Sequence, residues 1–133
     1  MENKYKHMDY IQSTITRMAS NSFYIKGWNI AVIAAIVALS LKESDWRIYA
    51  CALFLTIMFW LLDSYYLKQE KLFRELYKKV SQVSEDNEID FSMDTSPYKD
   101  NVPKIPCIML FNISVTPFYL SILIALMVLI HII

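Results

Sequence analysis

Glycine and histidine are scarce in this sequence, and their scarcity excludes several kinds of site. The 133 residues contain one glycine, Gly27, so a glycine-rich phosphate loop is excluded. The two histidines, His7 and His131, lie far apart and offer no metal-binding or catalytic cluster. Alternating acids at 86–90 lack the glycine and the final glutamate that a calcium loop needs. We therefore expect no enzymatic activity, no metal and no cofactor.

Cysteine and proline are also few. The two cysteines, Cys51 and Cys107, fall in apolar stretches, which predicts buried free thiols and no disulfide. Neither proline nor glycine occurs between Trp46 and Val83. We expect this stretch to form one long helix, apolar on all sides in its first half and amphipathic in its second.

Apolar residues, by contrast, are abundant. They make up 56% of the chain and the mean hydropathy is +0.31, yet charged residues still reach 20%. Such a mixture is typical of apolar membrane spans joined by charged segments. The predicted fold class is an all-α membrane protein with three transmembrane helices. The second helix extends into a long cytoplasmic helix, and an N-terminal amphipathic helix precedes the first.

Charges and prolines set the predicted boundaries. The charge-free stretch after Lys26 is short for a span, so Lys26 is expected to snorkel outward and the first span to begin near Ser22. Pro117 suits the first turn of the last span, where its missing N–H costs nothing. In chain order we expect an amphipathic helix (1–21), a first span (22–41), an outer turn (42–47), a second span (48–67), a helix extension (68–83), an acidic linker (84–104), an interfacial segment (105–116) and a third span (117–133).

The N-terminal segment carries a narrow apolar stripe. Its members recur at spacings of three and four and so share one helical face: Tyr5, Met8, Ile11, Ile15 and Met18. The segment has neither the apolar core nor the cleavage site of a secretory signal. It either lies on the membrane surface or packs on the cytoplasmic part of the second helix. The second arrangement is favoured, because the stripe is narrow and only weakly basic.

The distribution of lysine and arginine predicts the orientation. Four lie in the segment that ends at Lys26, two in the turn between the first two spans, and seven between Asp63 and Ile105. Since cytoplasmic segments carry an excess of these residues, we place the N-terminus and the helix extension in the cytoplasm and the C-terminus outside. The expected location is a bacterial inner membrane.

The helix extension presents two different faces. Leu72, Leu76 and Val80, together with Gln69, centre on one side of a helical wheel. The lysine and arginine residues are expected on the other side. Two of them follow a glutamate by four residues, which predicts the ion pairs Glu70–Arg74 and Glu75–Lys79. The predicted cationic face consists of Lys68, Lys71, Arg74, Lys78 and Lys79.

Two interpretations of this cationic face remain open. Copies gathered in an oligomer would form a positive ring able to hold phosphates or a short single strand. Alternatively, it is a solvated face near anionic lipid headgroups, which the sequence alone favours. Neighbouring aromatic residues could stack on bases or simply pack, and their helical spacing favours packing: Tyr65, Tyr66, Phe73 and Tyr77.

Asp63 also has two interpretations. It either pairs with Lys26 or Arg17, or lines a pore mouth, or it marks the place where the bilayer ends. The polar positions in or near the spans either line a pore or join helices by hydrogen bonds. These positions are Asn29, Ser40, Thr56, Asn112, Ser114, Thr116, Ser121 and His131.

Two stretches carry a family resemblance. Residues 17–28 have the form R-M-A-x-N-S-F-x-x-K-G-W, and residues 59–77 have the form F-W-x-L-D-x-Y-Y-L-x-Q-E-x-x-F-R-x-L-Y. With TPFYL at 116–120, the chain resembles small three-span membrane effectors encoded beside nucleotidyltransferases in bacterial anti-phage defence, of the Hailong type. The resemblance covers roughly two-thirds of the chain.

The resemblance implies a homo-oligomeric ion channel, for which a tetramer is expected, that depolarises the membrane. Its control would be a nucleotide or short single-stranded DNA oligomer made by the partner nucleotidyltransferase. Gating or inter-subunit roles are expected for Asn21, Asp63, Gln69 and Glu70. Ligand binding is expected for Lys68, Lys71, Arg74, Lys78, Arg17, Lys26, Tyr66 and Tyr77.

Two other functions compete with a gated channel. One is a non-conducting anchor or scaffold that recruits a partner through Leu72, Leu76 and Val80 on the helix extension. The other is a holin-like pore that needs no ligand.

Overall fold

The computed structural model describes residues 2–42 and 45–132. Its helices are α1 (Glu2–Ser40), α2 (Trp46–Ser81), α3 (Ile105–Phe111) and α4 (Thr116–Ile132), with two short 3-10 turns, η1 (Asp86–Glu88) and η2 (Ser96–Asn101). Within these described ranges 84% of the residues are helical and no strand occurs. The predicted all-helical class is therefore confirmed.

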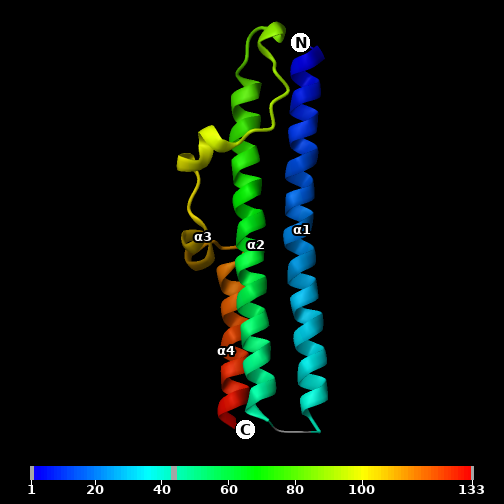
Figure 1. The fold of residues 1–133 in the computed structure, drawn as a ribbon, viewed down its shortest axis with the longest axis vertical. Coiled ribbons are helices and arrows are strands. Elements are labelled where there is room, and N and C mark those ends of the chain that lie inside the picture. The colour runs from blue at the N-terminus through cyan, green and yellow to red at the C-terminus, as the bar shows by residue number, and fades with distance from the viewer. Residues whose placement is uncertain (1, 43–44, 133) are drawn as a thin grey trace.

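Helices α1 and α2 form a long antiparallel hairpin. Figure 1 shows them side by side along their length, with α4 beside the N-terminal half of α2. The segment that follows α2 folds back along that helix before it enters α3. The N-terminus consequently lies beside the C-terminal end of α2, while α4 ends near the other end of the hairpin.

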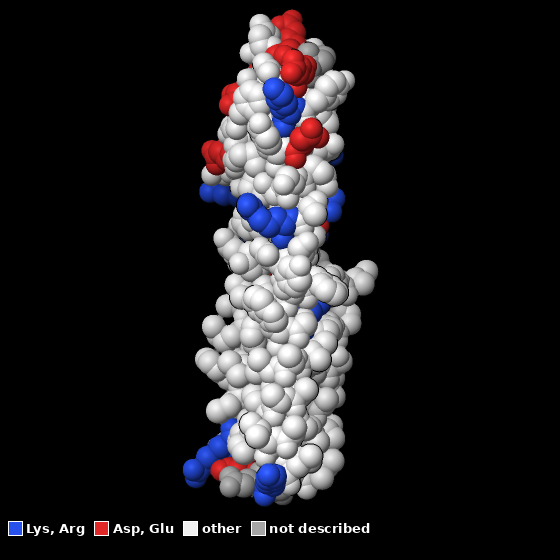
Figure 2. Space-filling view, turned by 90° about the vertical axis from the view of Figure 1, so that its right-hand side faces the viewer, with Lys and Arg blue, Asp and Glu red and all other residues white. Residues whose placement is uncertain are grey.

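Three stretches are long and apolar enough to cross a membrane by length and composition. They are Glu2–Ser40, Trp46–Ser81 and Ser96–Ile132, and no more than a third of the most apolar window of each is buried. Figure 2 shows a long belt nearly free of charged side chains, with charges gathered beyond both of its ends. This distribution fits a hairpin that spans a bilayer and projects one long charged end into water.

The N-terminal segment is not a separate helix. The predicted boundary between 1–21 and 22–41 falls inside α1, which continues across it without a break. Buried positions keep a near-heptad spacing on both sides of that boundary: Ile11, Ile15, Ser22, Ile25 and Asn29. Because no proline or break in this pattern interrupts the helix, one face of α1 packs on α2 from the charged end into the apolar belt.

The charged end of the hairpin has its own hydrophobic core. Ile11 and Ile15 of α1 pack with Leu76 and Val80 of α2, and none of the four is more than 6% exposed. The prediction that the N-terminal stripe packs on the second helix is confirmed, and a helix lying on the membrane surface is wrong. Tyr5, at the edge of the predicted stripe, is 60% exposed.

The acidic linker is irregular, as expected, but it is tied to α1. The carboxylate of Asp86 accepts hydrogen bonds from the backbone N–H of Lys4, at 2.9 Å, and of Asn3, at 3.3 Å. The first N–H groups of a helix have no partner inside the helix, and a carboxylate there also meets the positive end of the helix dipole. Asp86 therefore caps α1 from 82 residues away in sequence.

Lowering the pH is expected to weaken this cap. The Lys4 N–H bond holds the pKa of the Asp86 carboxyl below its ordinary value. A depressed pKa stabilises the fold above the unfolded-state pKa, and that contribution is lost as the pH falls through the folded-state pKa. In detergent micelles the Lys4 amide NMR signal should titrate below the ordinary aspartate range and should stop titrating in Asp86→Asn. An identical titration in that variant would assign the effect to another group.

The cysteines differ from expectation. Both Cys51 and Cys107 are free, but their side chains are exposed on the surface of the single chain and not buried. Cys51 lies on the outward face of α2, one residue before the buried Ala52.

Candidate functional site

Asp63 of α2 is the point at which three helices meet. Its side chain is fully buried and lies 2.7 Å from the Nζ atom of Lys26 on α1. The hydroxyl of Tyr119 on α4 donates at 2.9 Å to the same oxygen, Oδ2, that pairs with Lys26, and the hydroxyl of Ser22 on α1 donates to the other oxygen, Oδ1. One carboxylate thus joins α1, α2 and α4.

Lys26 completes the cluster from α1. Its Nζ also donates to the hydroxyl of Ser22 at 2.9 Å, since residues four apart lie on one helical face. Its side chain is only 17% exposed. The prediction that Lys26 snorkels outward is wrong, because the buried carboxylate offers a charge partner inside the bundle. For the same reason Lys26 does not lie with the expected ligand-binding residues.

Aromatic rings close the cluster on the α4 side. Tyr119 is fully buried and stacks on Trp60 with ring centroids 6.1 Å apart and planes 10° from parallel. Phe118 meets Tyr119 edge-on at 4.9 Å. This apolar wall excludes water and so strengthens the ion pair beside it. No role was predicted for Tyr119 from the sequence, although the residue lies within the TPFYL motif.

Because Asp63 pairs with Lys26 inside the bundle, the second span can extend beyond Asp63. If Asp63 marked the edge of the bilayer, the charge-free part of α2 would end at Leu62. With Asp63 paired inside the bundle, the outward surface of α2 carries no charge from Ile48 to Leu67. About 20 residues of helix cover the roughly 30 Å hydrocarbon core of a bilayer. The structure therefore favours a paired Asp63 within the span over a mere boundary marker.

Most polar residues of the spans join helices. Asn29 and Thr56 are fully buried between α1 and α2, with Thr56 Oγ1 3.5 Å from Asn29 Oδ1. The hydroxyls of Ser40 and Tyr49 lie 2.7 Å apart at the far end of the hairpin. Buried inside one chain, these groups hold the hairpin together and do not line a pore within it.

The other polar positions lie on or near α4. Thr116 donates to the Met109 carbonyl, Ser121 to the Phe118 carbonyl, and the side chain of Asn112 accepts from the backbone N–H of Ser114. His131 is exposed near the end of α4. These bonds are local, and the bond from Thr116 to Met109 connects the start of α4 to α3.

The predicted cationic face divides into two parts. Arg74 and Lys78 are exposed and Lys71 is half-buried, and these three share one side of α2. Lys79 instead lies over the ring of Tyr98 at 5.7 Å, on the side covered by the linker. Half-buried Lys68 also lies nearer to the buried stripe than the other three do. We call Lys71, Arg74 and Lys78 the cationic face from here on.

One of the two predicted ion pairs forms. Arg74 Nη2 lies 2.8 Å from the carboxylate of Glu70, as predicted. No ion pair joins Glu75 to Lys79 in the part of the chain that is described, because Lys79 turns toward the linker. The Glu70 side chain is only 13% exposed, whereas Arg74 is 61% exposed and stays accessible.

The remaining predicted site residues differ in burial and contacts. Tyr77 and Phe73 pack against the core of the charged end, so packing is their principal role. Tyr66 is half-buried and meets Tyr65 edge-on at 5.5 Å. Asn21 and Gln69 are half-buried, and Arg17 is exposed on α1.

The apolar stripe of the helix extension is already buried by contacts within the same chain. Leu72, Leu76 and Val80 are each at most 6% exposed. The latter two pack on Ile11 and Ile15 of the same chain, within the core of the charged end. A scaffold that recruits its partner through this stripe would have to displace α1 first.

Comparison of the chain with protein-family models, with curated proteins and with solved structures found no match.

Proposed function

We propose that this chain is the subunit of a homo-oligomeric ion channel in the bacterial inner membrane, gated by a nucleotide or short single-stranded DNA oligomer. In this proposal it acts as an effector of anti-phage defence, and a partner nucleotidyltransferase makes the ligand. The family resemblance suggests the ligand and the biological setting. The unbroken course of α1 and α2 from the apolar belt into the charged end is the observation that carries the gating mechanism.

The continuity of α1 and α2 from the apolar belt to the charged end supports gating of the channel by a ligand. The charged end is held rigid by the contacts of Ile11 and Ile15 with Leu76 and Val80. Farther along the same helices, the Lys26–Asp63 ion pair and the Tyr119 hydroxyl connect the hairpin to α4. A ligand that binds the charged ends of several copies would tilt these helices, and the tilt would reach all three spans. Such a ligand changes the open fraction only by its different affinity for the open and closed states.

The position of the cationic face supports an anionic ligand. Arg74 and Lys78 are exposed on a side of α2 that the linker leaves open. A ring of such faces around a symmetry axis would neutralise phosphates of one strand from several sides. We propose a tetramer, with the strand bound across the axis.

The conducting path is proposed to lie between copies. The polar groups of the hairpin, Asn29 and Thr56 among them, are fully buried between α1 and α2. A single copy thus turns its polar groups inward and its apolar side chains outward, and ions need a path bordered by several copies.

Helix α1 offers a surface suited to contact between copies. Gly27, Ala31, Ala34 and Ala38 share one side of α1, and all four are exposed. A Cβ atom added at Gly27 would meet nothing within 4 Å. Small residues at such spacing let helix backbones approach closely in a membrane.

Replacing Ala31 with leucine is expected to weaken or abolish the oligomer. The added side chain would hold neighbouring helices apart where the small residues allow close approach. Native mass spectrometry of the protein in detergent should show a shift from oligomer to monomer. Ile30→Leu, an exposed neighbour of unchanged volume, should keep the oligomer. An unchanged oligomer in Ala31→Leu would exclude this face of α1 from the interface.

Potassium efflux from liposomes tests the proposed activity. Liposomes that contain the purified protein should change their efflux rate when a short single-stranded DNA oligomer is present. Efflux that is constant with and without the oligomer would favour a holin-like pore. Lack of efflux under every condition would leave an anchor as the remaining function.

A further inference from the structure

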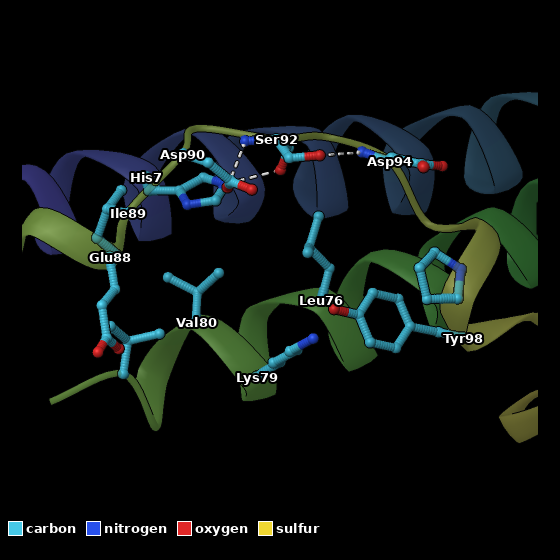
Figure 3. Close-up of a pocket in the computed structure, with 12 residues that line it drawn as sticks. His7, Leu76, Lys79, Val80, Glu88, Ile89, Asp90, Ser92, Asp94 and Tyr98 are labelled. Atoms are coloured by element: carbon cyan, nitrogen blue, oxygen red, sulfur yellow. Dashed lines mark hydrogen bonds between the residues drawn. The ribbon is translucent and has the colours of Figure 1, made fainter. Parts of the chain in front are cut away.

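A cavity of about 360 Å³ lies where the acidic linker crosses the charged ends of α1 and α2 (Figure 3). Cavities of this size accommodate small organic molecules. Its walls come from three places in the sequence: His7 of α1, Leu76, Lys79 and Val80 of α2, and Glu88 and Tyr98 among the linker residues. None of these residues belongs to the Asp63 cluster or to the cationic face.

His7 presents an unused nitrogen to this cavity. The side chain is 1% exposed, and its Nε2 atom lies 2.8 Å from the Ser92 carbonyl. Since a carbonyl only accepts, Nε2 carries the proton, and Nδ1 of the neutral ring is then an acceptor. Nδ1 is buried and has no hydrogen-bond partner among the described residues. In Figure 3 this second ring nitrogen faces away from Ser92 and toward the cavity.

The charges around the cavity favour a cation. Glu88, Asp90 and Asp94 line it, against one cation, Lys79. Asp90 and Asp94 each accept a backbone N–H of the linker at 3.0 Å. Glu88 lines the cavity and makes no ion pair within the described residues, and Figure 3 shows its carboxylate at the part of the cavity that lies away from the His7 ring. An ammonium group carries three donors, which match a carboxylate or a neutral imidazole nitrogen.

The remaining wall is apolar. Leu76 and Val80 form the side that belongs to α2, and Ile89 and the ring of Tyr98 contribute from the linker. Methylene groups of a ligand would lose contact with water against these side chains, which is favourable. The cavity therefore combines an acceptor-rich end with an aliphatic surface.

We propose that this cavity binds a primary alkylammonium, specifically a short aliphatic diamine. One ammonium group donates to His7 Nδ1, the other pairs with the Glu88 carboxylate of the linker, and the carbon chain between them lies along Val80. Such a ligand would fasten the linker to both helices of the hairpin, independently of whether the spans conduct ions.

Calorimetry with putrescine tests the site on the full chain in a non-ionic detergent. Putrescine should bind to the wild type, and binding should weaken as salt is added. Glu88→Gln should weaken it by about tenfold or more, since a charge-assisted hydrogen bond is lost. His7→Leu should have a similar effect, because leucine fills the place of the ring and offers no acceptor.

Two controls make the test decisive. Glu85→Gln removes the same charge from the linker at a residue outside the cavity, and it should bind putrescine like the wild type. Circular dichroism should show unchanged helix content in every variant. Absence of binding to the wild type at millimolar putrescine would overturn the proposal. Equal binding by all four proteins, or binding of inorganic phosphate in place of putrescine, would overturn it as well.

Discussion

Replacing Asp63 with alanine is expected to destabilise the protein by about 3–5 kcal/mol, because it leaves a buried lysine without its counter-charge. Lys26 has a side chain 17% exposed and lies 2.7 Å from Asp63, so the variant must either bury an unpaired ammonium or expose it by moving α1. Tyr119 would lose its acceptor in the same change. Thermal unfolding in detergent, followed by circular dichroism, measures the loss.

Two further variants separate the ion pair from simple packing. Lys26→Met combined with Asp63→Leu and Tyr119→Phe should recover most of the stability, because apolar residues of similar volume replace the buried pair and no Tyr119 hydroxyl is left without its acceptor. Tyr119→Phe should cost less than Asp63→Ala, about 1–3 kcal/mol for one unmade buried hydrogen bond. If Asp63→Ala unfolds at the wild-type temperature, the cluster does not hold the three helices together.

Reversing the charge of the cationic face is expected to abolish high-affinity oligonucleotide binding. Lys71→Glu, Arg74→Glu and Lys78→Glu together change six units of charge per copy, on a helix side that is exposed or half-buried. Each phosphate neutralised on a single strand contributes about −0.7 to the slope of log K against log salt. We expect the slope to fall in magnitude by about 2 for each copy that contacts the strand.

The control for this prediction lies at the other end of the hairpin. Lys42→Glu with Arg47→Glu reverses charges beyond the apolar belt, far from the cationic face. Fluorescence anisotropy with a labelled single strand at several salt concentrations should distinguish the two proteins. Wild-type affinity and slope in the triple variant would exclude the cationic face as the binding site.

Periodic and compositional features were predictable from the sequence. The long helix that begins at Trp46 was predicted because no proline or glycine interrupts it, and α2 ends at Ser81 with Gln82 as its C-cap. Packing of the N-terminal stripe on α2 was predicted because the stripe is narrow and only weakly basic, and Ile11 and Ile15 make that contact. Local rules of helix formation and amphipathicity suffice for such features.

Contacts between distant residues were not predictable in the same way. Ser22 and Tyr119 meet Asp63 across 41 and 56 residues of sequence, and the sequence alone does not give the rotation of each helix about its axis. Pairing with Lys26 was one of several open interpretations of Asp63. The predicted boundary between residues 1–21 and 22–41 was wrong because Lys26 was expected to face water, whereas its partner Asp63 lies inside the bundle.

The placement of Lys79 on the cationic face was wrong for a related reason. A helical wheel averages over a whole face, and Lys79 lies close to the buried stripe on it. The linker then covers that side, where Tyr98 meets the ammonium group at 5.7 Å. The course of an irregular linker depends on a few tertiary bonds, such as Asp86 to Lys4, that carry no periodic signal.

Sided recording in a planar bilayer is the most direct test of a channel gated through the charged end of the hairpin. Protein is inserted with known orientation, and a short single-stranded DNA oligomer is added to one chamber at a time. The account predicts a current that changes only when the oligomer reaches the side that holds residues 68–81, and no change in the triple charge-reversal variant. A membrane that never conducts, or a current that responds equally from both sides, would contradict it.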